Sequence, residues 1–221
     1  MSVYSATNDN GYNYDGELID SYTKNKSTSS RQFVIFHFTG QHIAAEERYP
    51  HTNEFMRFTA DSIQRNEPFL TKEKKEKIAH YDNATLYNDY VIKKIMDLFR
   101  EENAVMVYLS DHGEEVYDYR DSEGRCGGET NKNLLLYQYG VPFVIWCSPI
   151  YQERHPETME AIRGAVDRPF MTDNVCQVLF HLAGIESSYY KPERDLLSDD
   201  YKRPKRLVNR TIDYDAIVHA E

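Results

Sequence analysis

The chain has 221 residues and a formal net charge of −10, because 36 Asp and Glu residues outnumber 26 Lys and Arg residues. This length suits one α/β domain with a sizeable core. The acidic balance argues against a general binder of nucleic acid or of anionic membranes. The mean hydropathy is −0.71, and no apolar run approaches the roughly 18 residues that a membrane span requires.

Residues 1–30 are polar and rich in Asn, Ser, Tyr and Gly, which predicts a tail or a segment separated from its structural context. Within it, the amphipathic stretch from Asp15 to Tyr22 predicts a short helix. The run from Gln32 to Phe38 is almost wholly apolar and predicts a strand buried on both faces. His37 lies at the end of this strand and His42 just beyond it, after a glycine turn.

Residues 72–100 carry the strongest helical pattern in the chain, with Thr71 as the expected N-cap. The expected apolar face consists of Ile78, Tyr81, Thr85, Ile92, Ile95, Met96 and Phe99. The glycosylation pattern at Asn83 falls inside this helix, so its use is not expected.

The stretch AVMVYLSDHGEE, Ala104 to Glu115, begins as an apolar run and predicts a second strand buried on both faces. Ligands of α/β proteins bind beyond the carboxyl ends of strands, which is where Asp111 and His112 stand. A carboxylate beside an imidazole suits zinc. We expect Gly113 to turn the backbone sharply enough for both side chains to face one ion.

The second half of the chain predicts a long Gly-rich loop over about residues 117–133, a buried strand from Tyr139 to Cys147, and a helix from Thr172 to Ala183 with Gly184 as its C-cap. From Ser187 the chain is charged and predicts a surface segment. Cys147 and Cys176 are expected to be buried, whereas Cys126 could be exposed.

Four motifs in order resemble a known family, the bacterial phosphoethanolamine transferases of the sulfatase-like branch of the alkaline-phosphatase superfamily. That family has a strand ending in H-x-x-G-x-H, then R-Y-P, a helix with Y-D-N, and a strand ending in S-D-H-G-E. The corresponding residues here are His37 to His42, Arg48 to Pro50, Tyr81 to Asn83, and Ser110 to Glu114. The resemblance covers roughly residues 30–185.

The resemblance implies an α/β fold of the alkaline-phosphatase and sulfatase type, with a mixed central sheet flanked by helices and incomplete at its N-terminus. It implies a segment over 1–30, a catalytic part over 31–185 and a charged segment over 186–221. It also implies a zinc ion held by Asp111 and His112, with His42 near the transferred group or a second zinc and His37 in an orienting role. The expected reaction moves phosphoethanolamine from a phosphatidylethanolamine-type lipid to lipid A or a glycan, at the periplasmic face of a bacterial inner membrane.

Two departures from the family qualify this expectation. The family's Thr nucleophile and first acidic zinc ligand precede the H-x-x-G-x-H strand by well over thirty residues, as do its membrane helices. The chain is therefore expected to be the C-terminal part of a longer enzyme, inactive alone and holding half a metal site. In addition, residues 116–141 contain no histidine, whereas lipid A transferases have one in this loop. This departure suits a different acceptor, a site with one zinc ion, or a role for Arg120, Arg125 or Glu129 in place of that histidine.

Two alternatives stay open at this point. One is a sulfatase or phosphodiesterase of the same superfamily, although Cys147 to Tyr151 departs from the sulfatase C-x-P-x-R because Tyr151 replaces the arginine. The other is a non-catalytic binding module that kept the fold and lost its nucleophile.

Overall fold

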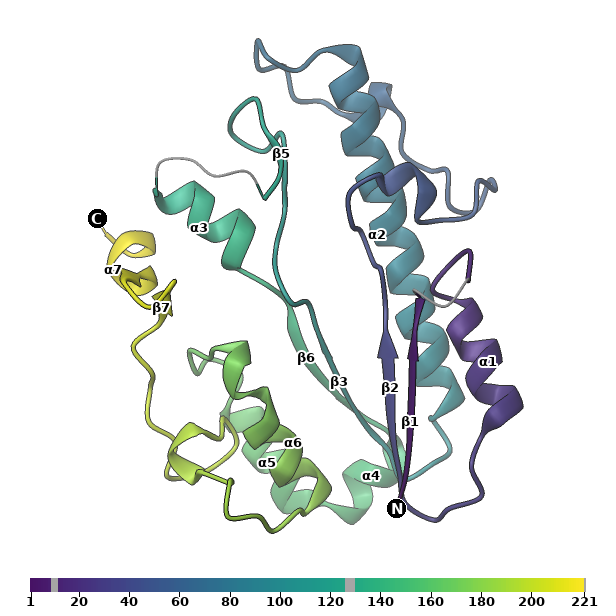
Figure 1. Cartoon of the computed structure of the whole chain (residues 1–221), viewed down its shortest axis with the longest axis vertical. Coiled ribbons are helices and arrows are strands. Elements are labelled where there is room, and N and C mark those ends of the chain that lie inside the picture. The colour runs from purple at the N-terminus through teal and green to yellow at the C-terminus, as the bar shows by residue number, and fades with distance from the viewer. Residues whose placement is uncertain (9–11, 126–129, 221) are drawn as a thin grey trace. The chain divides into compact units, whose positions relative to one another are not determined.

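The structure is a computed structural model that describes residues 1–8, 12–125 and 130–220. It divides into two compact units, each described below by itself (Figure 1). Unit 1 comprises Met1–Asp97 and Val116–Gly124, and unit 2 comprises Leu98–Glu115 and Arg125–Glu221. Cys126 and Glu129, which the sequence analysis singled out, lie outside the described residues. The domain boundaries expected at residues 30 and 185 stay predictions.

Unit 1 begins with a β-α-β arrangement. Strand β1 (Ser2–Thr7) pairs in parallel with β2 (Gln32–His37), and helix α1 (Glu17–Asn25) belongs to the connection between them. Figure 1 shows β1 and β2 side by side, with α1 beside the pair. Parallel strands require a crossover connection of this kind. The predicted short helix is confirmed, but the sequence analysis missed β1 because SVYSAT is short and half polar.

The β1–β2 pair packs against α1 through aromatic side chains. The Tyr22 ring, wholly buried, meets Tyr4 at 5.1 Å and Phe36 at 5.7 Å between ring centroids, edge to face in both cases. The prediction that β2 is buried on both faces is wrong, because its residues alternate between half-buried and exposed. Phe33 and Ile35 remain 38% and 39% exposed, since α1 covers one face of the pair only.

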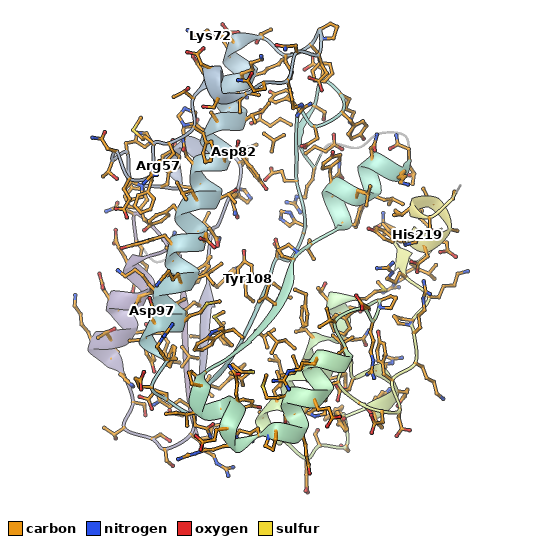
Figure 2. All side chains as sticks on the ribbon, turned by 180° about the vertical axis from the view of Figure 1, so that it is seen from behind. Arg57, Lys72, Asp82, Asp97, Tyr108 and His219 are labelled. Atoms are coloured by element: carbon orange, nitrogen blue, oxygen red, sulfur yellow. The ribbon has the colours of Figure 1, made fainter. Side chains whose placement is uncertain are left out.

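Helix α2 (Lys72–Leu98) is the long helix of unit 1, and its bounds agree with the predicted ones to within two residues. Lys72 and Asp97 mark its two ends in Figure 2. Thr71 caps its start by accepting a hydrogen bond of 3.4 Å from the Lys74 backbone N–H. The expected apolar face was wrong at Thr85, which is exposed, and the buried residues are Ile78, Ala79, Asn83, Ala84, Tyr87, Asn88, Val91 and Ile95.

The segment between β2 and α2 contains two 3₁₀ helices, η2 (Ala45–Glu47) and η3 (Ala60–Ser62). It is anchored on α2 by Asn83, whose side-chain oxygen accepts hydrogen bonds of 2.9 Å from the backbone N–H groups of Arg57 and Phe58. Asn83 is 2% exposed, which agrees with the expectation that its glycosylation pattern is not used. The short strands β4 (Glu115–Val116) and β5 (Glu123–Gly124) pair with each other.

Unit 2 is built on strand β3 (Val105–Leu109), which pairs antiparallel with β6 (Phe143–Cys147). The predicted strand position is confirmed. The prediction of burial on both faces is wrong, because all five β3 residues are half-buried, and among the residues that the structure describes β3 has one partner strand. The strand predicted from Tyr139 to Cys147 is shorter, because β6 begins at Phe143, and it is only partly buried. Helix α3 (Lys132–Tyr139), which was not predicted, precedes it.

The rest of unit 2 is helical. Helices α4 (Pro149–Arg154) and α5 (Pro156–Gly164) follow β6. The predicted helix from Thr172 is split into η4 (Thr172–Asn174) and α6 (Val175–Ala183), and Gly184 ends it with a φ of +60°, as predicted. Cys147 is buried as expected, whereas the expectation was wrong for Cys176, which is exposed.

The charged C-terminal segment belongs to unit 2 and ends in small elements. These are η5 (Pro192–Arg194), the paired strands β7 (Leu207–Val208) and β8 (Ile212–Asp213), and α7 (Tyr214–Val218). Leu196 and Leu197 join a buried cluster with Ala165 and Val178. Among the described residues of the whole chain, no helix combines the length and the apolar character needed to cross a membrane.

Candidate active site

The Asp111–His112 pair follows directly after β3, as predicted. The Asp111 side chain is 84% exposed and that of His112 is 24% exposed, with 3.6 Å between Asp111 Oδ1 and His112 Nε2. The backbone N–H of His112 donates to the same Oδ1 atom at 3.0 Å. This hydrogen bond turns the Asp111 carboxylate back toward the imidazole ring of His112. The two neighbouring residues therefore place an oxygen and a nitrogen that could bind a metal side by side.

The hydrogen bond on the other ring nitrogen determines the tautomer of His112. Nδ1 lies 3.0 Å from the carbonyl oxygen of Gly113, and because a carbonyl oxygen only accepts, Nδ1 must carry the proton. A neutral ring then has its lone pair on Nε2, the atom nearest to Asp111. Metal-bound histidines are commonly held by such a bond to a backbone carbonyl.

The spacing of these two donor atoms fits zinc. Ligand bonds of about 2.0–2.1 Å in a tetrahedral arrangement place neighbouring donors about 3.3 Å apart, close to the 3.6 Å found here. Within the described residues, however, no group of three or more His, Cys, Asp or Glu side chains could hold a metal ion. A zinc ion at this pair would therefore need further ligands from outside the described residues.

Gly113 is required at this site for a reason that the sequence analysis did not identify. Its φ is not in the left-handed region, unlike that of Gly40, Gly124 and Gly184, so the expected reliance on glycine's backbone freedom was wrong. A Cβ at Gly113 would lie 2.1 Å from the backbone oxygen of Tyr137 in α3. The Gly113 N–H also donates to the carbonyl oxygen of Gln138 at 3.0 Å, so the loop is seated directly on the α3 backbone.

Two further residues support this loop and were missed by the sequence analysis. Glu115 is wholly buried, and its Oε1 accepts a hydrogen bond of 2.7 Å from Gln138 Nε2. Gln138 thus holds the loop twice, through its backbone at Gly113 and through its side chain at Glu115. The sequence signal that could have identified Glu115 was its position directly after the S-D-H-G-E motif, at the end of a stretch that begins as a buried strand.

The second pair of predicted residues lies in unit 1. His37 ends β2 opposite Thr7 of β1, and its Nδ1 lies 3.1 Å from Thr7 Oγ1. His42 is exposed in the loop that follows. The structure therefore brings Asp111 and His112 together within unit 2, and it places His37 and His42 on one loop of unit 1.

Asp15 holds that loop, and the sequence analysis did not single it out. It is 4% exposed and accepts hydrogen bonds from the backbone N–H groups of Thr39 at 3.0 Å and Gly40 at 2.9 Å. Burial raises the pKa of the Asp15 carboxyl, and its hydrogen bonds and the charge of Arg48 partly offset this rise. The available signal was an aspartate at the start of the predicted helix.

The R-Y-P motif has a structural role in unit 1. Tyr49 is wholly buried, its hydroxyl oxygen accepts a hydrogen bond from Asn83 Nδ2 at 3.3 Å, and the same hydroxyl is hydrogen-bonded to His80 Nδ1 at 2.7 Å. Arg48 donates from Nη2 to the carbonyl oxygen of Ile43 at 3.0 Å, just after His42. The motif thus fixes the far side of the His37–His42 loop.

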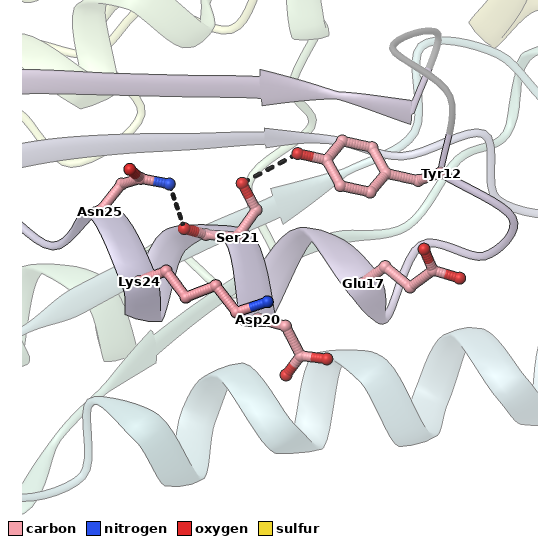
Figure 3. A pocket seen from close by; sticks show the side chains of 6 residues that line it. All are labelled: Tyr12, Glu17, Asp20, Ser21, Lys24 and Asn25. Atoms are coloured by element: carbon pink, nitrogen blue, oxygen red, sulfur yellow. Dashed lines mark hydrogen bonds between the residues drawn. The ribbon is translucent and has the colours of Figure 1, made fainter.

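Three further residues were candidates for the role of the missing histidine. Arg120 stacks over the Tyr119 ring at 5.4 Å, Arg125 is exposed, and Glu129 lies outside the described residues. A shallow pocket on α1, shown in Figure 3, is lined by Tyr12, Glu17, Asp20, Ser21, Lys24 and Asn25. It contains none of the predicted site residues.

Comparison with known proteins decides the family. The family model described as Sulfatase matches residues 1–185. The chain belongs to the sulfatase family. The match begins at residue 1, well before the first of the four motifs at His37, and it confirms the predicted resemblance.

The relatives of this sulfatase-family chain are transferases. It is 31% identical over 199 residues to phosphoethanolamine transferase EptC of Escherichia coli strain K12, covering 86% of this chain and 33% of that protein. It is 30% identical over 199 residues to phosphoethanolamine transferase CptA of Salmonella typhimurium, again covering 86% and 33%. The chain thus spans about a third of the length of these curated relatives.

Solved structures confirm the predicted α/β fold. The C-terminal periplasmic domain of EptC from Escherichia coli matches with a TM-score of 0.78 and 30% identity, over 92% of this chain and 58% of that one. The same domain in complex with Zn matches with a TM-score of 0.76 and 28% identity, over 94% and 59%. The roles of Asp111, His112, His37 and His42 stay predictions.

Proposed function

We propose that this chain is the C-terminal part of the catalytic domain of a zinc-dependent phosphoethanolamine transferase. The observation that carries the proposal is the Asp111–His112 pair, in which Nε2 lies 3.6 Å from a carboxylate oxygen and Nδ1 is held by a backbone carbonyl. The relatives are named as phosphoethanolamine transferases, and one neighbouring structure is a complex with Zn. These findings support a metal-assisted group transfer.

In this proposal Asp111 and His112 hold zinc together with an acidic residue and a Thr nucleophile that lie upstream of the chain. Bound zinc lowers the pKa of the nucleophile and neutralises charge on the phosphoryl group. His42 donates a hydrogen bond to a phosphoryl oxygen, because an imidazole N–H suits an oxygen that gains negative charge. His37 orients the start of the same loop through Thr7.

The donor in this proposal is a phosphatidylethanolamine-type lipid, and the acceptor is lipid A or a glycan. One relative is named as a transferase acting on Kdo(2)-lipid A, and the structural neighbours are periplasmic domains. We therefore place the parent enzyme at the periplasmic face of a bacterial inner membrane, attached through upstream segments. In this proposal the nucleophile is not among the 221 residues, and we expect the chain by itself to transfer nothing.

Zinc content after dialysis against trace zinc tests the metal site. We expect the chain to bind zinc weakly and His112→Ala to bind at least about tenfold less, because one of two ligands is lost. The control is His219→Ala, which removes an exposed histidine of α7's C-cap and should leave zinc binding unchanged.

Zinc content and enzymatic activity, both measured on the chain extended by its upstream segment, decide the proposal. Tight zinc binding with release of phosphoethanolamine from a lipid donor supports it. Cleavage of sulfate esters or phosphodiesters instead would establish the hydrolase alternative. An extended protein that carries no zinc and transfers nothing would contradict the proposal and favour a binding module.

A further inference from the structure

The Asp15 carboxylate is fully engaged with a loop that is remote in sequence. Oδ1 accepts from the backbone N–H of Thr39 at 3.0 Å and from Asn8 Nδ2 at 2.8 Å, and Oδ2 accepts from the backbone N–H of Gly40 at 2.9 Å. The side chain is 4% exposed. A buried carboxylate is costly unless hydrogen bonds to the charged form compensate for lost water, and here two of the three donors belong to one turn.

That turn needs an acceptor at this position. Gly40 has a φ of +61°, and in such a turn the successive N–H groups of Thr39 and Gly40 point the same way and form an anion-binding concavity. Asp15 occupies it as an internal anion. Without the carboxylate, both N–H groups would lose their partner in a half-buried part of the chain.

The loop that Asp15 holds carries both predicted histidines of unit 1. Thr39 and Gly40 lie between His37 and His42, so their position sets the path of the chain from one histidine to the other. On the far side, Arg48 Nη2 binds the carbonyl oxygen of Ile43. Hydrogen bonds therefore hold the segment on both sides of His42, to the Asp15 carboxylate before it and from the Arg48 guanidinium after it. The hydrogen bonds of Asp15 to Thr39 and Gly40 are called the carboxylate clasp below.

Asp15 is itself held by the long helix of unit 1. The backbone N–H of the next residue, Gly16, donates to Tyr87 Oη of α2 at 3.3 Å. A Cβ at Gly16 would lie 2.6 Å from the same oxygen, so the approach is close. Tyr87 is 6% exposed. The carboxylate thus projects from a position fixed on α2, which gives the clasp a rigid base.

We propose that Asp15 is a positioning residue for the transfer reaction, which acts by fixing the Thr39–Gly40 turn and with it the placement of His42. This inference rests on the proposed function. It assigns a role to the N-terminal segment, which the sequence analysis treated as lying outside the catalytic part.

Amide hydrogen exchange in the 221-residue chain tests the clasp directly. In Asp15→Ala, exchange at Thr39 and Gly40 should accelerate by at least about tenfold, because hydrogen bonds to a charged group are lost. Asp15→Asn keeps one acceptor oxygen and should release one of the two amides. The matched control is Asp20→Asn, an exposed aspartate on α1, which should change neither. Unchanged exchange at both amides in Asp15→Asn would overturn the clasp, including in the case where Asp15→Ala fails to fold.

Kinetics of the enzyme extended by its upstream segment test the positioning role. Asp15→Ala should lower kcat by about tenfold to a hundredfold with KM for the lipid donor little changed, because the reacting geometry is lost while donor contacts remain. The kcat of Asp15→Asn should lie between that of the unsubstituted enzyme and that of Asp15→Ala. Faster exchange at Thr39 and Gly40 with an unchanged kcat would overturn the positioning role alone. An unsubstituted enzyme that transfers nothing would instead refute the proposed function, while the exchange measurement still decides the clasp.

Discussion

Two loops of this chain carry the candidate chemistry, and they are held in opposite ways. The loop after β2 is held by a side chain, because the Asp15 carboxylate binds the N–H groups of Thr39 and Gly40. The loop after β3 is held by close contact between backbones, because Gly113 lies against Tyr137 and Gln138 of α3. The first depends on a charge that can be removed. The second depends on the absence of a side chain at Gly113, with the hydrogen bond between Glu115 and Gln138 as a further support. Substitutions should therefore damage them differently.

The largest expected effect breaks the backbone contact. Gly113→Ala places a Cβ 2.1 Å from the Tyr137 carbonyl oxygen, so the loop or α3 must move. We expect the free energy of unfolding to fall by about 3 kcal/mol or more, measured by urea denaturation. Gly164→Ala is the control, because a Cβ there meets nothing within 4 Å and should change stability by no more than about 1 kcal/mol, on the stabilising side. Equal effects at both positions would contradict the steric account.

A smaller effect should follow from removing the buried support of the same loop. Glu115→Ala deletes the bond between Oε1 and Gln138 Nε2, and we expect it to cost about 2 kcal/mol because the site is fully buried. Zinc binding at Asp111 and His112 should weaken by about tenfold, since the loop that carries them loses an anchor. Calorimetric titration with zinc measures this, with the exposed Glu160→Ala as control. A drop in stability with intact zinc affinity would show that Glu115 supports the fold but not the ligand pair.

The carboxylate clasp should reveal itself through pH. Because burial raises the pKa of Asp15, the folded chain binds this proton more tightly than the unfolded chain does. The contribution of this group to the free energy of unfolding is therefore greatest below the ordinary Asp pKa of about 3.9. It falls as pH rises from there through the raised value.

Asp15→Asn removes this titration. The difference in unfolding free energy between the unsubstituted chain and Asp15→Asn, followed by urea denaturation, should decline across that acidic window and level off above it. Asp20→Asn serves as the control. A difference that grows with pH would mean that the N–H groups of Thr39 and Gly40 overcompensate for burial.

The smallest expected effect concerns His37. Thr7→Val removes the hydroxyl 3.1 Å from His37 Nδ1, and because the pair is exposed we expect a loss of stability of no more than about 0.5 kcal/mol. The change should instead appear as added motion of the His37 ring in NMR relaxation, with no change at His112. Unchanged order of the His37 ring in Thr7→Val would show that the Thr7 hydroxyl does not orient His37.

Local pattern was sufficient for the elements that could be predicted. The apolar runs located β2 and β3, the helical spacing located α1 and α2, and the residues just after each strand identified Asp111, His112, His37 and His42 as candidates. Strand burial was overestimated in both cases, because an apolar strand reads the same whether one or both of its faces are covered. Strand β1 was missed because its sequence, SVYSAT, is half polar and shows no apolar run. It forms a strand through its backbone pairing with β2, which the local sequence does not reveal.

The sequence by itself determined the family, through four motifs in order, and the pairing of Asp111 with His112, because neighbouring residues stay close in any fold. Only the tertiary structure decided what holds the two loops. Asp15 lies 24 residues from Thr39, and Glu115 lies 23 residues from Gln138. Such contacts are made by chain segments that folding brings together, and a single carboxylate or a single glycine carries no mark of its distant partner.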